Sequence, residues 1–207
     1  MSSIVIIDYG SGNIRSVGKA FEHVALETSN IIVSSDARAL ETASHIVLPG
    51  VGAFADCMAG LSALPDMLDV LKEQVMVQKK WFLGVCVGMQ MLFERGHEHG
   101  VHDGLGWLKG EVVPLAHSSL KIPHMGWNAL KIQQKSSLLA GVEDGDHAYF
   151  VHSYHAKLTD NSKLLAAVEY GEKIAAVVGS DNIFGTQFHP EKSQKTGLRI
   201  LENFVRL

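Results

Sequence analysis

Cysteine is scarce in this chain: its 207 residues include two, Cys57 and Cys86. Two cysteines form at most one bridge, so a disulfide framework is excluded and a reducing, cytoplasmic location is the simplest expectation. No apolar stretch approaches the ~18 residues that indicate a membrane-spanning helix. The strand-like run that begins at Ile4 follows no basic segment, so we expect no secretory signal.

Charged residues are also few, at 19% of the chain against about 25% in typical globular proteins. The formal net charge is −4 and no run of like charges stands out, which argues against the basic face that nucleic-acid binding requires. Hydrophobic residues make up 46% of the chain, enough for a sizeable core. A chain of this length suits one domain spanning residues 1–207.

Short apolar runs alternate with helix-like segments in the first half of the chain. The runs cover residues 4–7, 31–33, 45–48 and 81–85, and the helical segments cover residues 14–24, 53–79 and 87–94, with Pro65 starting a fresh helical segment inside the second of these. Continuous apolar strands separated by helices predict a parallel sheet covered on both faces. The second half contains strand candidates at residues 111–115, 128–133, 147–155, 164–169, 174–178 and 183–188, and a closing helix at residues 197–207. Because short connections separate the last strands, we expect an α/β fold with an open, mostly parallel mixed sheet, helices on both faces and an antiparallel portion.

Residues 84–88 read Gly-Val-Cys-Val-Gly, between a predicted strand and a predicted helix. This pattern is typical of a nucleophile elbow with cysteine in place of serine. The glycines remove side chains that would clash in the sharp turn, and the helix N-terminus favours the thiolate of Cys86. The alternative is a small buried cysteine at a strand end. Cys57 lies inside a helical stretch without such glycines, and we expect it to be structural.

His189 precedes Pro190 after another predicted strand. The residue before a proline favours extended backbone, so the side chains of His189 and Glu191 are expected to face the same side. This spacing suits a histidine base that a carboxylate orients. A solvated strand end is the alternative, and it is less favoured once an elbow cysteine is present.

Two further segments have polar or glycine-rich character. Residues 50–52 (Gly-Val-Gly) follow a strand and can present backbone N–H groups as oxyanion donors, or can form a tight turn. The histidines between residues 97 and 102 could hold a metal, but the flanking glycines favour a solvated, mobile loop. We expect neither a metal nor a cofactor.

The elbow, continued by Met89 and Gln90, and residues 187–191 (Gln-Phe-His-Pro-Glu) together resemble the class I glutamine amidotransferase family. The resemblance implies an enzyme that hydrolyses glutamine through a triad of Cys86, His189 and Glu191. It implies an oxyanion hole at Gly50, Val51, Gly52 and Val87, where Val87 replaces a commoner leucine. It also implies that glutamine is bound by Gln90, Glu98, Ser153 and Tyr154.

Residues 8–13, 49–54, 123–128 and 149–154 resemble one branch of this family, the glutaminase subunits of imidazole glycerol phosphate synthase in histidine biosynthesis. The resemblance implies a cyclase partner with a (β/α)8 barrel. Ammonia would pass to this partner for formation of imidazole glycerol phosphate and an aminoimidazole carboxamide ribonucleotide. The residues implied at the partner interface are Asn13, Pro123, His124, Met125, Trp127, Asn128, Tyr149 and Lys192.

Three other functions remain open from the sequence. A paralogous glutaminase that supplies ammonia to a different acceptor enzyme, such as a sugar amidotransferase, would share nearly all of these motifs. A non-catalytic binding subunit on the same fold would usually have lost a triad residue. A cysteine peptidase or other hydrolase is disfavoured only by the resemblance.

Overall fold

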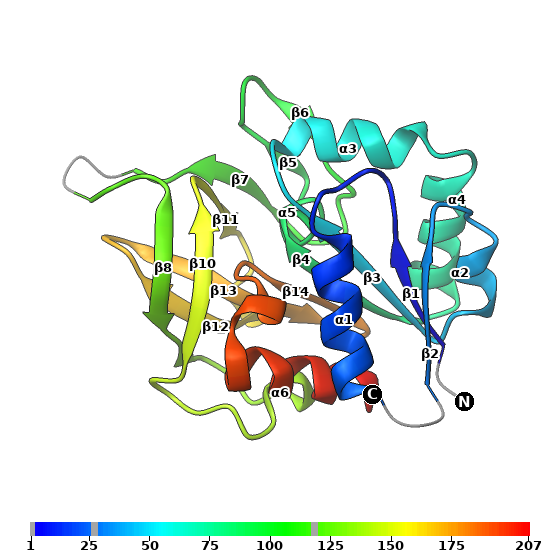
Figure 1. Cartoon of the computed structure of the whole chain (residues 1–207). Helices are drawn as coiled ribbons and strands as arrows, with labels where there is room; N and C mark the ends of the chain where they lie inside the picture. The colour runs from blue at the N-terminus through cyan, green and yellow to red at the C-terminus, as the bar shows by residue number, and fades with distance from the viewer. Residues whose placement is uncertain (1–2, 26–28, 117–119) are drawn as a thin grey trace.

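A mixed eight-stranded sheet forms the centre of the protein (Figure 1). The computed structural model describes residues 3–25, 29–116 and 120–207. The strand order is β2-β1-β3-β4-β14-β13-β12-β9, in which β2 to β14 run parallel and the last three strands are antiparallel. The bounds of these strands are β1 Ser3–Ile7, β2 Asn30–Ser34, β3 His45–Gly50, β4 Trp81–Cys86, β9 Lys131–Ile132, β12 Leu164–Glu169, β13 Lys173–Ser180 and β14 Ile183–Thr186.

The parallel strands are apolar along their length because both of their faces are covered. Residues 4–7 of β1 are fully buried, and every residue of β3 is buried. Parallel strands are joined by right-handed crossovers. The helix α1 joins β1 to β2 and therefore lies on one face, while α2, α3 and α4, on the connections that run in the opposite direction from β2 through β3 to β4, lie on the other. In Figure 1, α1 lies in front of the sheet and packs against α6, away from α2, α3 and α4. The helices are α1 Ile14–Val24, α2 Ala39–Thr42, α3 Phe54–Ala63, α4 Met67–Lys72, α5 Val87–Gln90 and α6 Gln194–Val205.

Two smaller sheets stand beside the antiparallel end of the main sheet (Figure 1). One pairs β8 with β10, and the other has the order β11-β7-β5-β6. Their strands are β5 Arg95–Gly96, β6 His102–Asp103, β7 Gly110–Pro114, β8 His124–Ala129, β10 His147–His152 and β11 Tyr154–Leu158. The remaining short elements are a π-helix, η1 Glu73–Val77, and the 3₁₀ helices η2 Ser137–Leu139, η3 Asn161–Lys163 and η4 Pro190–Lys192.

The expected fold class is confirmed, and so is the fresh helical segment expected from Pro65, since α3 ends at Ala63, Leu64 is extended and α4 begins at Met67. Three other segments differ from the prediction. The strand expected over residues 128–133 is interrupted at Leu130, which separates β8 from β9, and these two strands belong to different sheets. The strand expected over residues 147–155 is broken at Ser153 into β10 and β11, which belong to different sheets. The helix expected over residues 87–94 ends at Gln90.

The helix α5 ends early because the carbonyl groups that follow it accept hydrogen bonds from another segment of the chain. The carbonyl groups of residues 91–93 accept hydrogen bonds from backbone N–H groups of residues 105–108 instead of continuing the helix. The side chains of residues 91–93 are fully buried, so their apolar character reflects the core and not a helical face. Within the described ranges, no helix has the length and apolar character needed to cross a membrane.

Candidate active site

Cys86 is the last residue of β4 and directly precedes α5. Its φ of 56° and ψ of −111° lie in a region that side-chain-bearing residues rarely adopt. Such backbone strain is found at functional sites, where the surrounding structure holds it in place. The turn therefore has the geometry expected of a nucleophile elbow.

Glycines on three neighbouring elements make this turn sterically possible. A Cβ on Gly88 would lie 1.8 Å from the carbonyl oxygen of Leu48 in β3. A Cβ on Gly84 would lie 2.4 Å from the carbonyl oxygen of Gly88, and one on Gly50 would lie 2.6 Å from the Gly88 nitrogen. The backbones of β3, β4 and α5 thus touch at Gly88, directly beside Cys86.

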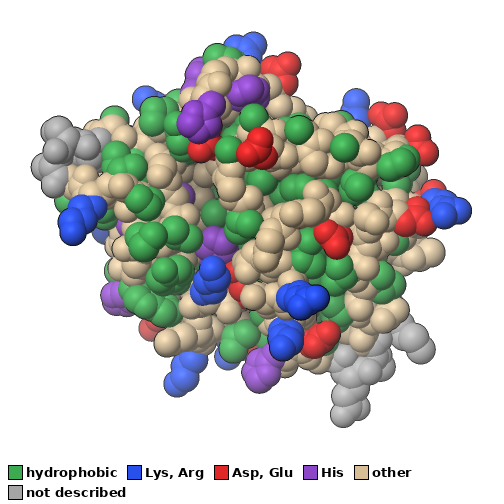
Figure 2. Space-filling model, turned by 45° about the horizontal axis from the view of Figure 1, so that its top comes forward, with side chains coloured by type: hydrophobic (Ala, Val, Ile, Leu, Met, Phe, Trp, Pro, Cys, Tyr) green, Lys and Arg blue, Asp and Glu red, His purple; other side chains and the backbone are tan. Residues whose placement is uncertain are grey.

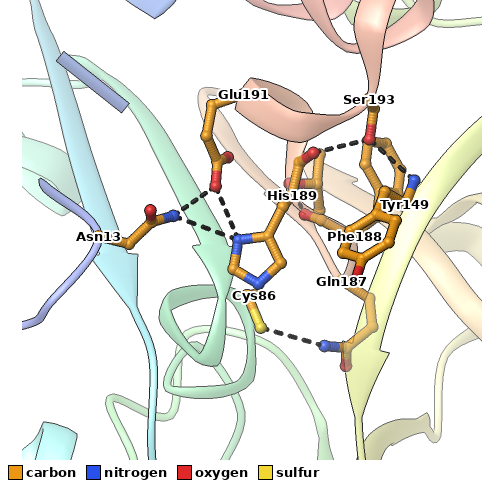
Figure 3. Close-up of polar contacts among 9 residues, drawn as sticks. Asn13, Cys86, Tyr149, Gln187, Phe188, His189, Glu191 and Ser193 are labelled. Atoms are coloured by element: carbon orange, nitrogen blue, oxygen red, sulfur yellow. Dashed lines mark hydrogen bonds and ion pairs between the residues drawn. The ribbon is translucent and has the colours of Figure 1, made fainter. Parts of the chain in front are cut away.

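His189 and Glu191 form a buried pair next to Cys86 (Figure 3). His189 Nδ1 lies 2.8 Å from Glu191 Oε1, and the two side chains are 2% and 1% exposed. Burial alone lowers the pKa of His189, but its interactions with Cys86 and Glu191 outweigh burial and raise the pKa to about 9. Burial alone raises the pKa of Glu191, while hydrogen bonds with His189 and Asn13 hold it below its usual value. At neutral pH the pair is therefore an imidazolium and a carboxylate.

Asn13, which we expected at the partner interface, contacts this pair (Figure 3). Its side-chain amide donates a hydrogen bond to Glu191 Oε1 and lies 3.3 Å from His189 Nδ1. Asn13 is the residue before α1, at the opposite end of the chain from His189. No spacing rule in the sequence connects residues this far apart, so the contact could not have been predicted.

Two other residues near the pair have roles that sequence reasoning missed. Gln187 is fully buried, and its Nε2 lies 3.9 Å from Cys86 Sγ (Figure 3). The Ser193 hydroxyl donates to the carbonyl oxygen of His189 and accepts from the backbone N–H of Tyr149 in β10. Gln187 belongs to the same motif as His189, and this proximity in the sequence was the available signal.

The Gly-Val-Gly segment lies beside Cys86, where Gly50 is its direct neighbour across the β3–β4 ladder. Side-chain hydrogen bonds hold the backbone on both sides of the Gly50–Val51 peptide. The Tyr9 hydroxyl donates to the carbonyl oxygen of Pro49 at 2.7 Å, and Cys57 Sγ donates to that of Val51 at 3.4 Å. Gly52 has a φ of +99°, which a side chain would strain. Cys57 is buried in α3.

A pocket of about 310 Å³ opens at Cys86. Its lining includes residues expected at the triad, the oxyanion hole and the glutamine site, namely Cys86, His189, Val51, Gly52, Val87, Gln90, Glu98, Ser153 and Tyr154. Gln90 Nε2 donates to the carbonyl oxygen of Tyr154 and to Gln187 Oε1, so both of its N–H groups are used. Glu98 Oε2 accepts the backbone N–H of Phe54 at 2.8 Å, which fixes Glu98 at the rim.

Hydrophobic side chains gather on the surface near β8 (Figure 2). Met125 is 63% exposed and Trp127 is 46% exposed, and the ring of Tyr149 packs edge-on against Trp127. Pro123 and Lys192 are also exposed, and Asn128 is half-buried.

His124 requires a correction, since its side chain is buried and faces the interior. The residue alternation of β8 explains this, because its neighbour Met125 points to the opposite side.

The histidine-rich segment, residues 97–102, follows β5 and forms the connection to β6, which begins at His102. His97 Nε2 lies 2.7 Å from Glu111 Oε2. Among the described residues, no group of three or more His, Cys, Asp or Glu side chains is arranged to hold a metal.

Comparison with known proteins places these features in context. The family described as glutamine amidotransferase class-I matches residues 5–207. A protein of Rhodospirillum rubrum named imidazole glycerol phosphate synthase subunit HisH is 50% identical over 98% of both chains. Proteins of the same name from Cereibacter sphaeroides and Brucella suis are each 48% identical, over 97% and 98% of both chains.

Solved structures show the same fold at lower sequence identity. A glutamine amidotransferase crystal structure has a TM-score of 0.75 at 17% identity, covering 98% of this chain and 99% of that one. A glutamine amidotransferase of Thermotoga maritima has a TM-score of 0.69 at 17% identity, covering 97% of this chain and 81% of that one. With a family match across nearly the whole sequence, this chain belongs to the class I glutamine amidotransferases.

Proposed function

We propose that this chain is the glutaminase subunit of an imidazole glycerol phosphate synthase, with Cys86, His189 and Glu191 as its catalytic triad. The observation that carries the catalytic part is the meeting of an elbow cysteine with a buried imidazolium–carboxylate pair at one pocket. The relatives that share about half of the sequence over nearly its full length support the histidine-pathway assignment.

In the first half of the reaction, the thiolate of Cys86 attacks the side-chain amide carbon of glutamine. The carbonyl oxygen becomes an oxyanion, and backbone N–H groups of Val87 and of the Gly50–Gly52 segment stabilise it. His189, protonated at neutral pH because of its raised pKa, donates its proton to the departing nitrogen. The carbon–nitrogen bond breaks, ammonia leaves, and a γ-glutamyl thioester remains on Cys86.

In the second half, the neutral imidazole of His189 takes a proton from water. The resulting hydroxide attacks the thioester carbon, and the carbon–sulfur bond breaks to release glutamate and the thiolate. Glu191 holds Nδ1 of the ring, and Asn13 holds the Glu191 carboxylate, so the other ring nitrogen faces the reacting groups. All of these steps use side chains and backbone of this chain together with water.

The Gly50–Val51 peptide is the natural place to control this activity. It carries a candidate oxyanion donor, and side-chain hydrogen bonds hold the carbonyl groups of Pro49 and Val51 on either side of it. Rotation of this peptide would complete the oxyanion hole only when the partner is loaded. Locking this peptide by substitution should abolish stimulation by the partner, and undiminished stimulation would contradict the idea.

The partner in this proposal is a cyclase subunit with a (β/α)8 barrel, docked against the exposed residues around β8. Met125 and Trp127 supply the apolar contacts, and Pro123, Asn128, Tyr149 and Lys192 lie around them. Ammonia passes through the barrel to a phosphoribosyl-formimino substrate, giving imidazole glycerol phosphate and an aminoimidazole carboxamide ribonucleotide. Residues 1–207 act as one domain, and its two free thiols suit a reducing cytoplasm.

Glutamate release from glutamine tests the proposal, measured for the chain alone and with a cyclase subunit plus its nucleotide ligand. We expect strong stimulation by the loaded cyclase and none in Cys86→Ala. Glutamate release that does not change when the loaded cyclase is added would support the glutaminase activity and reject the histidine-pathway assignment. Activity that survives in Cys86→Ala would reject the triad.

A further inference from the structure

Two buried histidines, His124 and His152, face each other across the β8–β10 ladder beside the pocket. They are 3% and 6% exposed, and His124 Nδ1 lies 2.9 Å from His152 Nε2. The ring of His124 is stacked between Phe150 and Tyr170, with centroid distances of 4.8 and 4.0 Å. Both the position and the plane of this ring are therefore fixed by packing.

Each of these rings is neutral at physiological pH. Burial lowers the pKa of His124 to about 4. Burial, assisted by neighbouring histidines, lowers that of His152 to about 3. A neutral imidazole has one nitrogen that donates and one that accepts, so the partners of each ring determine its tautomer.

The first tautomer is set by Asn128. Its Oδ1 accepts from the backbone N–H of Ala129, and its Nδ2 donates to the carbonyl oxygen of Glu169. Backbone groups have fixed roles, so the amide orientation is determined. Asn128 Nδ2 then also donates to His124 Nε2 at 3.2 Å, which must accept. The proton of His124 is consequently on Nδ1.

The second tautomer follows from the first. His124 Nδ1 donates to His152 Nε2, so the proton of His152 is on Nδ1. His152 Nδ1 lies 3.0 Å from the carbonyl oxygen of Tyr154, which can only accept. From Asn128 through His124 and His152 to the Tyr154 carbonyl, each donor thus meets an acceptor. We call these four residues the hydrogen-bond series.

The series ends on an atom that also positions a predicted substrate contact. The carbonyl oxygen of Tyr154 accepts from Gln90 Nε2 at 2.9 Å as well as from His152. A carbonyl oxygen has two lone pairs, and both are used. Ser153, His152 and Tyr154 form one wall of the pocket, at the point where the chain passes from β10 to β11. Buried backbone groups at such a junction need hydrogen-bond partners, and for the Tyr154 carbonyl these are the side chains of Gln90 and His152.

We propose that His124 and His152 are positioning residues that hold the pocket wall at residues 153–154 and the side chain of Gln90 in the conformation that binds glutamine. The inference rests on the proposed glutaminase function for the identity of the ligand. Neither histidine exchanges a proton with the substrate. Loss of the series is expected to weaken glutamine binding and to leave the chemical step at Cys86 nearly unchanged.

The closing experiment combines kinetics with a readout that needs no substrate. In the complex with the cyclase and its ligand, His152→Leu is expected to raise the KM for glutamine about ten-fold, as for a lost buried hydrogen bond, with kcat changed less than about three-fold. His152→Asn keeps a donor near the Nδ1 position and should recover most of the affinity. His45→Leu is the matched control, because His45 is a buried histidine at the start of β3, at the opposite end of the strand from Gly50, and it does not line the pocket.

Nitrogen chemical shifts of the two rings in the full-length chain at pH 7 report their tautomers directly. We expect the Nδ1–H form for both. An Nε2–H or protonated ring at either position, an unchanged KM in His152→Leu, or an equal rise of KM in His45→Leu would overturn the proposal. If the unsubstituted complex releases no glutamate, the proposed function fails, while the ring tautomers still decide whether the series exists.

Discussion

Substitution of Gly88 by alanine tests whether the close contact at the elbow is required for the fold. The new Cβ would lie 1.8 Å from the carbonyl oxygen of Leu48, and Cβ contacts in proteins essentially never fall below 3.0 Å. The backbones of α5 and β3 would have to separate by 3.0 − 1.8 = 1.2 Å or more. Overpacking a core usually costs ~1–3 kcal/mol. Because both groups here are buried backbone, we expect at least the upper end of that range.

A loss of ~3 kcal/mol in a chain of this size lowers the melting temperature by roughly 6–12 °C. Urea unfolding should show a lower midpoint with an unchanged slope. Gly18→Ala is the control, since Gly18 lies within α1 and its Cβ would make ordinary contacts of 3.9 Å with Ile6 and Val33. Replacing a helical glycine should stabilise the protein by ~0.5–1 kcal/mol. A Gly88→Ala protein within 1 kcal/mol of the unsubstituted protein would refute the steric reasoning.

Three further outcomes follow from the triad and its neighbours. Glu191→Gln removes the charge that supports the imidazolium, so kcat for glutamate release by the complex should fall about 10²–10⁴-fold, and a loss below ten-fold would contradict its role. The stabilisation that His189 contributes should be fully present below pH 6.5 and lost as pH rises through about 9, because folding raises its pKa above the ordinary 6.5. The difference in free energy of unfolding between the unsubstituted chain and His189→Asn, measured by thermal unfolding, should therefore shrink by up to ~3 kcal/mol from pH 6 to pH 10. A difference that does not change with pH would exclude this linkage. Gln187→Met removes the N–H donor near Cys86 Sγ and should slow glutamate release by roughly ten-fold or more, with unchanged stability as the check that the variant is folded.

The parallel half of the fold could be predicted because strands buried on both faces are continuous apolar runs. The elbow could be predicted because its two glycines and its cysteine lie within five residues of one another, at positions 84, 86 and 88. Residues 91–93 misled the helix prediction, since full burial makes them apolar whatever their backbone conformation. Their carbonyl partners at residues 105–108 cannot be inferred from local pattern.

Contacts between distant segments account for the rest of what the sequence did not reveal. Asn13 reaches Glu191 only because α1 and η4 are brought together by the sheet. The break at Ser153 was hidden because β10 and β11 read as one strand, although they pair in different sheets. The burial of His124 depends on which face of β8 meets the core. The strand was expected to begin at residue 128, after His124, so the alternation along the strand could not be used to place the His124 side chain.

The position of β14 has a consequence for the order in which this protein is completed during synthesis. This strand is last in the chain, yet it lies between β4 and β13 and joins the parallel half of the sheet to the antiparallel half. Until it leaves the ribosome, β4 has an open edge, and the nucleophile at its end has no base, since His189 follows β14 directly. Closure of the sheet and assembly of the triad are therefore one event. A chain cut off before residue 183 would carry the reactive thiol and its elbow, but it could not carry out the reaction.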